Sequence, residues 1–416
     1  ILELLSHQNF ADMKLGHEPE FKFTVARSIY KSVLRYIATM HQTDSIVQPL
    51  PIINFAIQEG KKHTFKLSWQ GVNDPSEPTA KPRGYIVYTR LGHGGWDNGT
   101  YTKDNEYTFQ AEAGLVYSFK VTAVNEGGES FPSEILSAYH AKKNQGTVLI
   151  VNAFDRTSGP ASFNTPTRQG FLMDRDPGIP YLYSPAFCGN QQAYDKKYIG
   201  LETEEGLGYS GNEWEGILIA GNTFDYPFVH GKAIQASGNH SFVSCSNEAL
   251  EKGFINMNNY PIVDLIMGAE KKAFNHNMQR ILTEYTQQGG NILMSGSYIG
   301  SEMNSPDEMI FTENILKYTH GGSMRGVTTG NVSGINNQYA FPIKINEETY
   351  AVPAPDCILP TGGAYSTFVY TPGNYGAGIG YKGTDYRTFI LGFPLESIRG
   401  AQQRGSIMKA ILNFFK

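Results

Sequence analysis

The sequence predicts a multidomain chain in which a β-sandwich is followed by an α/β doubly wound, mostly parallel sheet. Between residues 51 and 141, apolar and polar residues alternate with a period of two, which is typical of antiparallel strands buried on one face. From residue 146 to residue 416, continuous apolar runs alternate with helical patterns, which is typical of parallel strands covered by helices. A length of 416 residues allows two or three domains.

The composition limits the partners of this chain. Its formal charge is −5 and it has no run of Lys or Arg, so we expect no nucleic acid partner. No apolar stretch approaches the roughly 18 residues of a membrane span. Cys188, Cys245 and Cys357 lie far apart without CxxC spacing, which argues against a disulfide framework or a structural zinc site. Aromatic residues at 12% and 45 glycines are typical of secreted proteins that handle glycans.

Residues 1–44 are predicted to form a strand and a helix ahead of the sandwich. The opening Ile-Leu-Glu-Leu-Leu reads as a buried strand that carries one carboxylate, Glu3. Between residues 21 and 40, apolar residues recur every four positions, which predicts an amphipathic helix with Arg27, Lys31 and Arg35 on its outer face. A polar segment with two prolines follows and is expected to be a linker.

The segments "KLSW", "GYIVYTR" and "VYSFKVTAVNEGGESFPSE" in residues 51–141 resemble a fibronectin type III domain, an immunoglobulin-like sandwich. The resemblance implies that Trp69 is the core tryptophan of the second strand. It also implies that Tyr117 is the tyrosine that locks the corner before the penultimate strand. Modules of this kind usually space other domains or bind ligands, so we expect no catalytic residue here.

Residues 146–416 contain five apolar runs that predict parallel strands: "TVLIVNAF", "HSFVSC", "IVDLIMG", "NILMSG" and "TFILGF". A helix is predicted over residues 271–288, closed by two glycines, and another after the last run. Residues 155–215 and 301–388 are too long for simple connections, so we expect insertions that build a binding cleft. The order of these parts resembles the glutamine-amidotransferase-like, or flavodoxin-like, group of α/β domains.

Four segments of the same region resemble a bacterial group labelled xanthan-lyase-like: "VLIVNAFDRTSGPASF", "AGNTFDYPFVHGKAI", "GGNILMSGSYIGSEM" and "ILGFPLESI". Members of that group are often joined to a fibronectin type III module and an amidase domain. The resemblance implies a secreted, periplasmic or cell-surface protein and a glycan or peptidoglycan fragment as partner. The sequence has nothing similar to the toroid of true polysaccharide lyases.

The first 44 residues are similar to the end of a zinc-dependent N-acetylmuramoyl-L-alanine amidase. The matching segments are "LELLSHQNFADM" and "ARSIYKSVLRYIA", whereas Leu5, Ser6 and Gln8 depart from the usual Gly-Phe-x-Ser. The resemblance implies that Glu3 is the catalytic carboxylate beside a zinc-bound water and that Asn9 follows it at the family spacing. It places the zinc ligands upstream. We therefore expect a remnant of a larger domain with no metal site or cofactor, inactive as an amidase, whereas the full-length parent would hold zinc.

In an open parallel sheet, ligands bind beyond the carboxyl ends of the strands, and these ends provide most of the binding candidates. Arg156 offers a fork for a carboxylate such as an uronic acid, and a polar segment over residues 222–230 is expected to fold over the rim of the cleft. The predicted ligand-binding residues are Asp155, Arg156, Asn222, Asp225, Tyr226, Glu270 and Glu396.

Two possible nucleophiles and two possible bases are candidates for catalysis in the α/β region. Cys245 follows a strand where a helix could begin, and Ser297 lies in a glycine-flanked turn. Their base would be His230 or His240, and His230 could pair with Asp225. The alternatives are a helix N-cap after Cys245, a tight turn at Ser297 and a loop held by Asx turns around residues 222–230.

Two functions follow from these features. The first is an accessory region of a secreted cell-envelope protein that binds a glycan or peptidoglycan fragment without turnover. The alternative is a hydrolase that uses Cys245 or Ser297 as its nucleophile, and these residues would then need a histidine within hydrogen-bond reach. A purely structural adhesion module is a third possibility. The oligomeric state is left open by the sequence.

Overall fold

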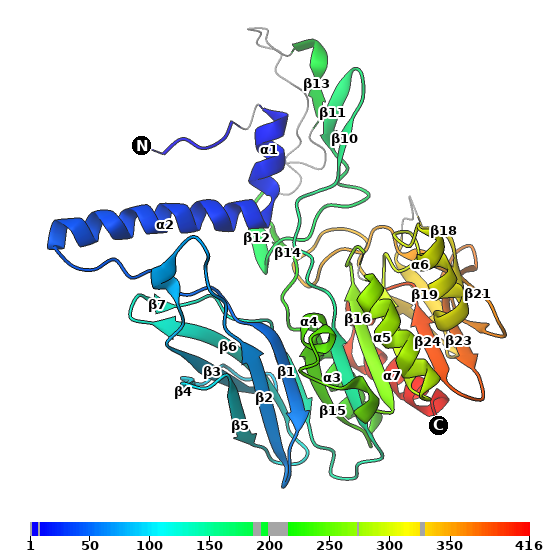
Figure 1. Ribbon diagram of the computed structural model, residues 1–416. Helices are drawn as coiled ribbons and strands as arrows, with labels where there is room; N and C mark the ends of the chain where they lie inside the picture. Colours follow the sequence, from blue (N-terminus) through cyan, green and yellow to red (C-terminus); the bar gives the residue numbers. More distant parts are fainter. Residues whose placement is uncertain (1, 7–8, 186–192, 199–214, 273, 325–328) are drawn as a thin grey trace.

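The structure is a computed structural model that describes residues 2–6, 9–185, 193–198, 215–272, 274–324 and 329–416 (Figure 1). Over these residues the chain is mostly β, with a large mixed sheet and three small sheets. A β-sandwich lies beside a sheet that carries helices, and a long helix lies across one end of the sandwich (Figure 1). None of the described helices is long and apolar enough to cross a membrane.

The N-terminal segment forms two helices, α1 (Phe10–His17) and α2 (Pro19–His41). The helix expected from the sequence is confirmed by α2. The expected orientation of its faces is wrong, because Arg27 and Lys31 point toward the sandwich, whereas Val33 and Ile37 are 51% and 49% exposed. The predicted strand is wrong, because residues 2–5 are exposed and have no strand partner in the described structure. Asn9 is the N-cap of α1, where its side-chain oxygen accepts a hydrogen bond from the backbone of Ala11 at 2.9 Å.

Salt bridges fasten α2 to the sandwich. Arg27 pairs with Asp74 at 3.0 Å, and Lys31 and Arg35 both reach Glu77, at 3.3 and 2.7 Å. Since Asp74 and Glu77 are almost fully buried beneath the helix, these contacts hold its inner face in one position.

Eight strands form the sandwich in two antiparallel sheets. Trp69 is buried in its core, and the hydroxyl of Tyr117 accepts a hydrogen bond from the backbone N–H of Glu112 at 3.2 Å. Both roles implied by the resemblance are thus confirmed. One sheet pairs β1 (Ile53–Glu59), β2 (Thr64–Gln70) and β5 (Glu106–Gln110), and the other pairs β3 (Gly84–Leu91), β4 (Thr100–Thr102), β6 (Val116–Asn125), β7 (Gly128–Glu129) and β8 (Leu136–Tyr139).

Each of the five predicted apolar runs is a strand, and adjacent strands run parallel in the order β15-β9-β16-β17-β24. Antiparallel strands then extend this sheet from β24 through β23, β22, β19 and β20, which makes it mixed. The bounds are β9 (Thr147–Asn152), β15 (Ser241–Ser246), β16 (Ile262–Gly268), β17 (Asn291–Gly296), β19 (Asn331–Gly334), β20 (Asn337–Ala340), β22 (Tyr365–Thr371), β23 (Tyr375–Lys382) and β24 (Arg387–Leu391).

Helices cover both faces of the parallel strands. Alternate residues of β9 point to opposite faces of the sheet. Leu149 packs on the face covered by α4 (Asn247–Glu251) and α5 (His276–Gln287), whereas Ile150 packs on the face covered by a second pair of helices. That pair is α3 (Tyr226–Ser237) and α7 (Ala401–Phe414). The helix predicted from residue 271 begins five residues later, because Asn275 is its N-cap and accepts from the backbone of Met278.

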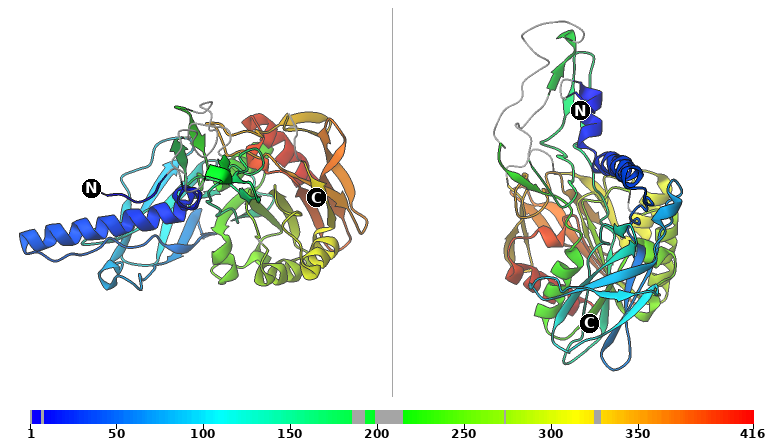
Figure 2. Two further views of the ribbon diagram at one scale, coloured as in Figure 1. Left: turned by 90° about the horizontal axis from the view of Figure 1, so that it is seen from above. Right: turned by 90° about the vertical axis from the view of Figure 1, so that its left-hand side faces the viewer.

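The two long insertions contain short strands of their own. The first carries a small sheet that stands away from the main body beside α1 (Figures 1 and 2), where Phe10 packs on Phe171 with 5.3 Å between ring centroids. The elements are β10 (Ser162–Asn164), β11 (Arg168–Phe171), β12 (Tyr183–Pro185), β13 (Ala193–Asp195), β14 (Leu218–Ala220), α6 (Pro306–Phe311), β18 (Tyr318–Ser323) and β21 (Asp356–Pro360).

The sandwich and the mixed sheet are joined at the edge strand β15. The Ser244 hydroxyl accepts from the backbone N–H of Ser137 at 2.8 Å and donates to its carbonyl at 2.7 Å. A second contact is the bidentate pair between Arg90 of the sandwich and Asp225 before α3, at 2.8 and 2.7 Å. The apolar core of the sandwich continues through Cys245 to the α4 and α5 side of the sheet.

Candidate functional site

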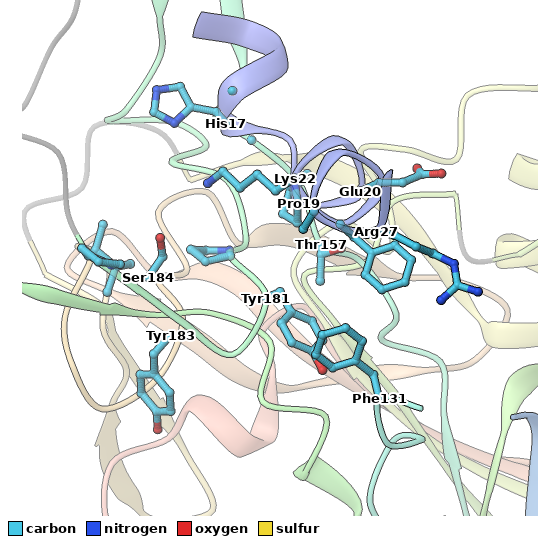
Figure 3. A pocket seen from close by; sticks show the side chains of 18 of the residues that line it. His17, Pro19, Glu20, Lys22, Arg27, Phe131, Thr157, Tyr181, Tyr183 and Ser184 are labelled. Carbon is cyan, nitrogen blue, oxygen red and sulfur yellow. The ribbon is translucent and has the colours of Figure 1, made fainter. Parts of the chain in front are cut away.

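A cavity of about 950 Å³ lies between α2, the sandwich and the first insertion (Figure 3). Aromatic rings line it from all three sides: Phe23 and Tyr30 from α2, Phe131 from the sandwich, and Tyr181 and Tyr183 from the insertion. The volume is within the usual range for a ligand site. We call this cavity the aromatic groove.

Three of the five rings of the aromatic groove are exposed. Phe131 is 49% exposed, Tyr181 40% and Tyr183 48%. Phe131 is held by Phe23, with 5.6 Å between ring centroids, and Tyr181 by Phe224, also at 5.6 Å. Clustered exposed rings of this kind mark surfaces that a ligand or partner covers.

Prolines and a short strand pair shape the insertion wall of the groove. Pro177, Pro180 and Pro185 restrict the backbone of this segment. The segment is fixed where Leu182 exchanges backbone hydrogen bonds with residues 221 and 222, at 2.7 and 2.9 Å. The tyrosines therefore project from a constrained backbone.

Charged side chains of α2 form the rim of the groove. Glu20 and Lys22 are exposed there, and Arg27 is engaged with Asp74 and with the carbonyl of Gln48 at 3.2 Å. An apolar floor with a polar rim suits a ligand that has a flat apolar face and polar substituents, such as a pyranose ring.

Arg156 is not open to a ligand, which corrects the sequence-based expectation. Its guanidinium donates to both carboxylate oxygens of Asp176, at 2.9 and 2.7 Å, and to the carbonyl of Ala269 at 3.2 Å. Lys271 reaches the same carboxylate at 2.7 Å. The side chains of Arg156 and Asp176 are both 9% exposed. Asp176 belongs to the first insertion, whose path over the sheet cannot be deduced from sequence periodicity.

Glu270 and Asp155 do meet at the carboxyl edge, as expected. The carboxylate of Glu270 accepts backbone hydrogen bonds from Asp155 at 3.0 Å, Arg156 at 2.6 Å and Lys271 at 2.9 Å. Burial raises the pKa of Glu270 although these donors oppose the rise. Its oxygens thus hold the two loops together.

His230 is a buried cation rather than a general base. It lies within α3, where Nδ1 is 2.8 Å from Asp264 and Nε2 is 3.2 Å from Glu396. Burial alone would lower its pKa, but the charges and hydrogen bonds of these two carboxylates raise the pKa to about 10. The hydroxyl of Tyr350 donates to Glu396 at 2.6 Å. Glu396 is therefore in the core and not in a cleft.

The other residues predicted over 222–230 also have structural partners. Asp225 pairs with Arg90 and not with His230. Asn222 donates to the carbonyl of Phe154 at 2.8 Å, and the hydroxyl of Tyr226 donates to the carbonyl of Gly221 at 3.0 Å. The expected loop over the rim is wrong, because α3 begins at Tyr226 and these side chains are directed inward.

The two candidate nucleophiles are buried without a histidine partner among the described residues. Cys245 is fully buried, and burial raises the pKa of its thiol well above the usual value. Ser297 donates to the carbonyl of Gly268 at 3.2 Å, as in a tight turn. His240 precedes β15 and so lies at the opposite edge from Ser297. The N-cap alternative is confirmed by Ser246, which accepts from Ala249.

Cys245 is consequently expected to resist alkylation. Incubation of the folded protein with iodoacetamide should leave this thiol unmodified in a mass-spectrometric peptide map, because neither solvent nor a thiolate-stabilising cation reaches it. Denaturation should make it fully reactive. Rapid modification in the native state would restore the nucleophile hypothesis.

The amidase resemblance implies a zinc ion beside Glu3 in the full-length parent. Glu3 is exposed. Within the part of the chain that the structure describes, no group of three or more His, Cys, Asp or Glu side chains is arranged to hold a metal ion.

Phe131, Tyr181 and Tyr183 are groove residues that the sequence did not predict. The only sequence signal for the two tyrosines was the alternation of prolines and tyrosines in "GIPYLYSP". Phe131 had no such signal, because it joins the groove only through the docking of α2 on the sandwich.

Comparison with known proteins gives similarities that cover parts of the chain. No family model matches it. A stretch of 120 residues is 42% identical to the "Putative receptor-type tyrosine-protein phosphatase mosPTP-1" of Aedes aegypti, covering 26% of this chain and about 9% of that protein's length. The β-galactosidase of the haloarchaeon Halorubrum lacusprofundi is similar over 49% of this chain and 27% of its own, with a TM-score of 0.33 and 11% identity. The twitchin kinase region of C. elegans is similar over 23% of this chain and 17% of its own, with a TM-score of 0.20 and 22% identity.

Proposed function

We propose that this chain is the ligand-binding, non-catalytic region of a secreted or cell-surface protein of the bacterial envelope, and that it binds a glycan or peptidoglycan fragment in the aromatic groove. The observation that carries the proposal is the gathering of aromatic rings from three separate elements around one cavity, with the rings of Phe131, Tyr181 and Tyr183 exposed. Turnover is not part of the proposal, because Cys245, Ser297 and His230 are buried in structural contacts.

The strand order supports the finer fold assignment that we propose. Numbered along the chain, the parallel strands lie in the order 2-1-3-4-5, which is that of flavodoxin-like doubly wound sheets. We also propose that residues 51–141 are a fibronectin type III module. The proposed parent is an N-acetylmuramoyl-L-alanine amidase, of which residues 1–44 would be the end. The resemblance of their sequence supports this last step.

The groove assignment is tested by replacing one ring. Tyr181→Ala should weaken binding of a soluble muropeptide or its disaccharide about fivefold in isothermal titration calorimetry, since stacking on one aromatic ring is worth about 1 kcal/mol. Tyr375 is a matched control, because it is 56% exposed and does not line the groove.

Tyr375→Ala should leave the affinity unchanged. Equal affinities of both variants and the wild type, with the fold intact by circular dichroism, would move the site elsewhere. The absence of any heat of binding with both the glycan and the muropeptide would contradict the proposed function.

A further inference from the structure

A second group of polar residues lies at the carboxyl ends of β9 and β15, next to the sandwich. Asp155 follows β9, Glu248 is in the first turn of α4, and Glu134 comes from the turn before β8. Asp155 is within electrostatic reach of both other carboxylates. No described Lys, Arg or His forms an ion pair with any of the three.

Other carboxylates in the described structure have different hydrogen-bond and ion-pair partners. Those that are fully buried have a cationic partner or several N–H donors, as buried charges require. The ion pairs are Glu77 with Lys31 and Arg35, Asp176 with Arg156 and Lys271, and both Asp264 and Glu396 with His230. Asp356 instead accepts hydrogen bonds from the backbone N–H groups of Gly300 and Ser301. Glu134 and Asp155 are partly buried and Glu248 is exposed, and none of the three has a cationic partner among the described residues.

Two amide oxygens of the same group also lack donors. Asn152 is completely buried at the end of β9, where its Nδ2 donates to Glu134 at 2.6 Å. Its Oδ1 has no hydrogen-bond partner in the described structure, and neither does the Oδ1 of Asn247, which neighbours Asp155. An unsatisfied buried acceptor costs about 1–3 kcal/mol, so these oxygens mark a place that needs a donor.

The electrostatics agree with this geometry. Burial, with repulsion from Glu248 and Glu134, raises the pKa of Asp155 well above its usual range. Burial and then Glu248 raise the pKa of Glu134 to about 8, although Asn152 opposes the rise. Both shifts are those of carboxylates that have lost water without gaining a positive charge.

We propose that Glu134, Asn152, Asp155 and Asn247 bind the ammonium group of an amine-bearing ligand, with Glu248 at the entrance. A primary ammonium presents three N–H donors and one positive charge, which matches two carboxylates and an unpartnered amide oxygen. Glu248 is exposed, so the group opens to solvent there. A metal ion is a poorer match, because no described set of three or more ligating side chains has the required arrangement. The site does not depend on the aromatic groove, since none of these residues lines it.

A pair of ligands that differ only in the amine tests the proposal. Nα-acetyl-lysine amide keeps a charged ammonium at pH 7, whereas the Nε-acetylated form does not. In an NMR titration the charged ligand should bind at least tenfold more tightly to the wild type. Asp155→Asn should remove this preference, and the matched control Asp104→Asn, at an exposed aspartate outside the group, should retain it.

The thermal midpoint separates a ligand site from a structural one. Asp155→Asn should leave the midpoint unchanged or raise it, because it removes a charge that is repelled by its neighbours. If that variant does not fold, Glu134→Gln serves in its place. Equal binding of the two lysine derivatives by the wild type would overturn the proposal. Stoichiometric binding of calcium that Asp155→Asn abolishes, without any preference for the amine, would identify a metal site instead. Loss of muropeptide binding in Tyr181→Ala leaves this test unaffected.

Discussion

Replacing His230 with glutamine is expected to lower the free energy of unfolding by about 3–5 kcal/mol, the range for breaking a buried ion pair from one side. His230 is completely buried between Asp264 and Glu396, and both carboxylates are in the core with it. Without the imidazolium, one carboxylate must be protonated or remain unpaired in an apolar setting. Urea unfolding followed by circular dichroism measures the loss.

The pH dependence of this loss identifies its cause. The folded-state pKa of His230, about 10, is above the ordinary value of 6.5, so the imidazolium stabilises the fold in full below pH 6.5. The contribution then declines and is lost as the pH rises through 10. The difference between wild type and His230→Gln should therefore be constant from about pH 5 to 6.5 and shrink toward pH 10.

His41 provides the control for this experiment, because it is exposed at the end of α2. His41→Gln should change the free energy of unfolding by no more than about 0.5 kcal/mol at any pH in this range. A loss in His230→Gln that is the same at pH 6 and pH 10 would mean that shape and not charge explains the effect.

Replacing Arg90 with alanine is expected to destabilise the contact between the sandwich and the mixed sheet by about 3 kcal/mol. The guanidinium binds both oxygens of Asp225 and the hydroxyl of Ser118, and it lies between the rings of Trp96 and Phe228, 4.9 and 4.7 Å from their centroids. Its removal leaves Asp225 half-buried without a cation. Scanning calorimetry should show the single unfolding transition broaden or separate into two.

Two further variants refine the interpretation of Arg90. Arg90→Lys keeps the charge but loses the planar fork, so an intermediate loss is expected. Lys66→Ala breaks the exposed pair with Glu106 in the same sandwich and should cost less than about 1 kcal/mol. If Arg90→Ala and Lys66→Ala have equal effects, Arg90 does not link the two parts.

The sequence predicted the elements whose residues are patterned locally. Continuous apolar runs indicated all five parallel strands, because a strand covered on both faces contains few polar residues. Trp69 and Tyr117 were identified because the alternating pattern of the sandwich strands is regular. The strand predicted at residues 2–5 was wrong, because an apolar run forms a strand only where a neighbouring strand supplies hydrogen bonds.

The candidate site was less predictable, because it depends on contacts between distant residues. Arg156 and Asp176 are 20 residues apart and meet through an irregular insertion. His230 and Glu396 are 166 residues apart. Polar residues at the strand ends were predicted to contact a ligand, whereas many of them form hydrogen bonds or ion pairs with other residues of the chain. Periodicity reports which face of an element is buried but not which charges become partners.

The junction at β15 also bears on the kinetics of ligand capture. One wall of the aromatic groove is carried by the sandwich and α2, and the other by an insertion of the mixed sheet. Since Ser244, Ser137 and Arg90 hold these two parts at a fixed angle, the walls need not close around an incoming ligand. Such preorganisation avoids an ordering cost of about 0.5–1.5 kcal/mol for each side chain that is already immobile. Association should then follow a single exponential, and ligands of different affinity should differ chiefly in how fast they leave.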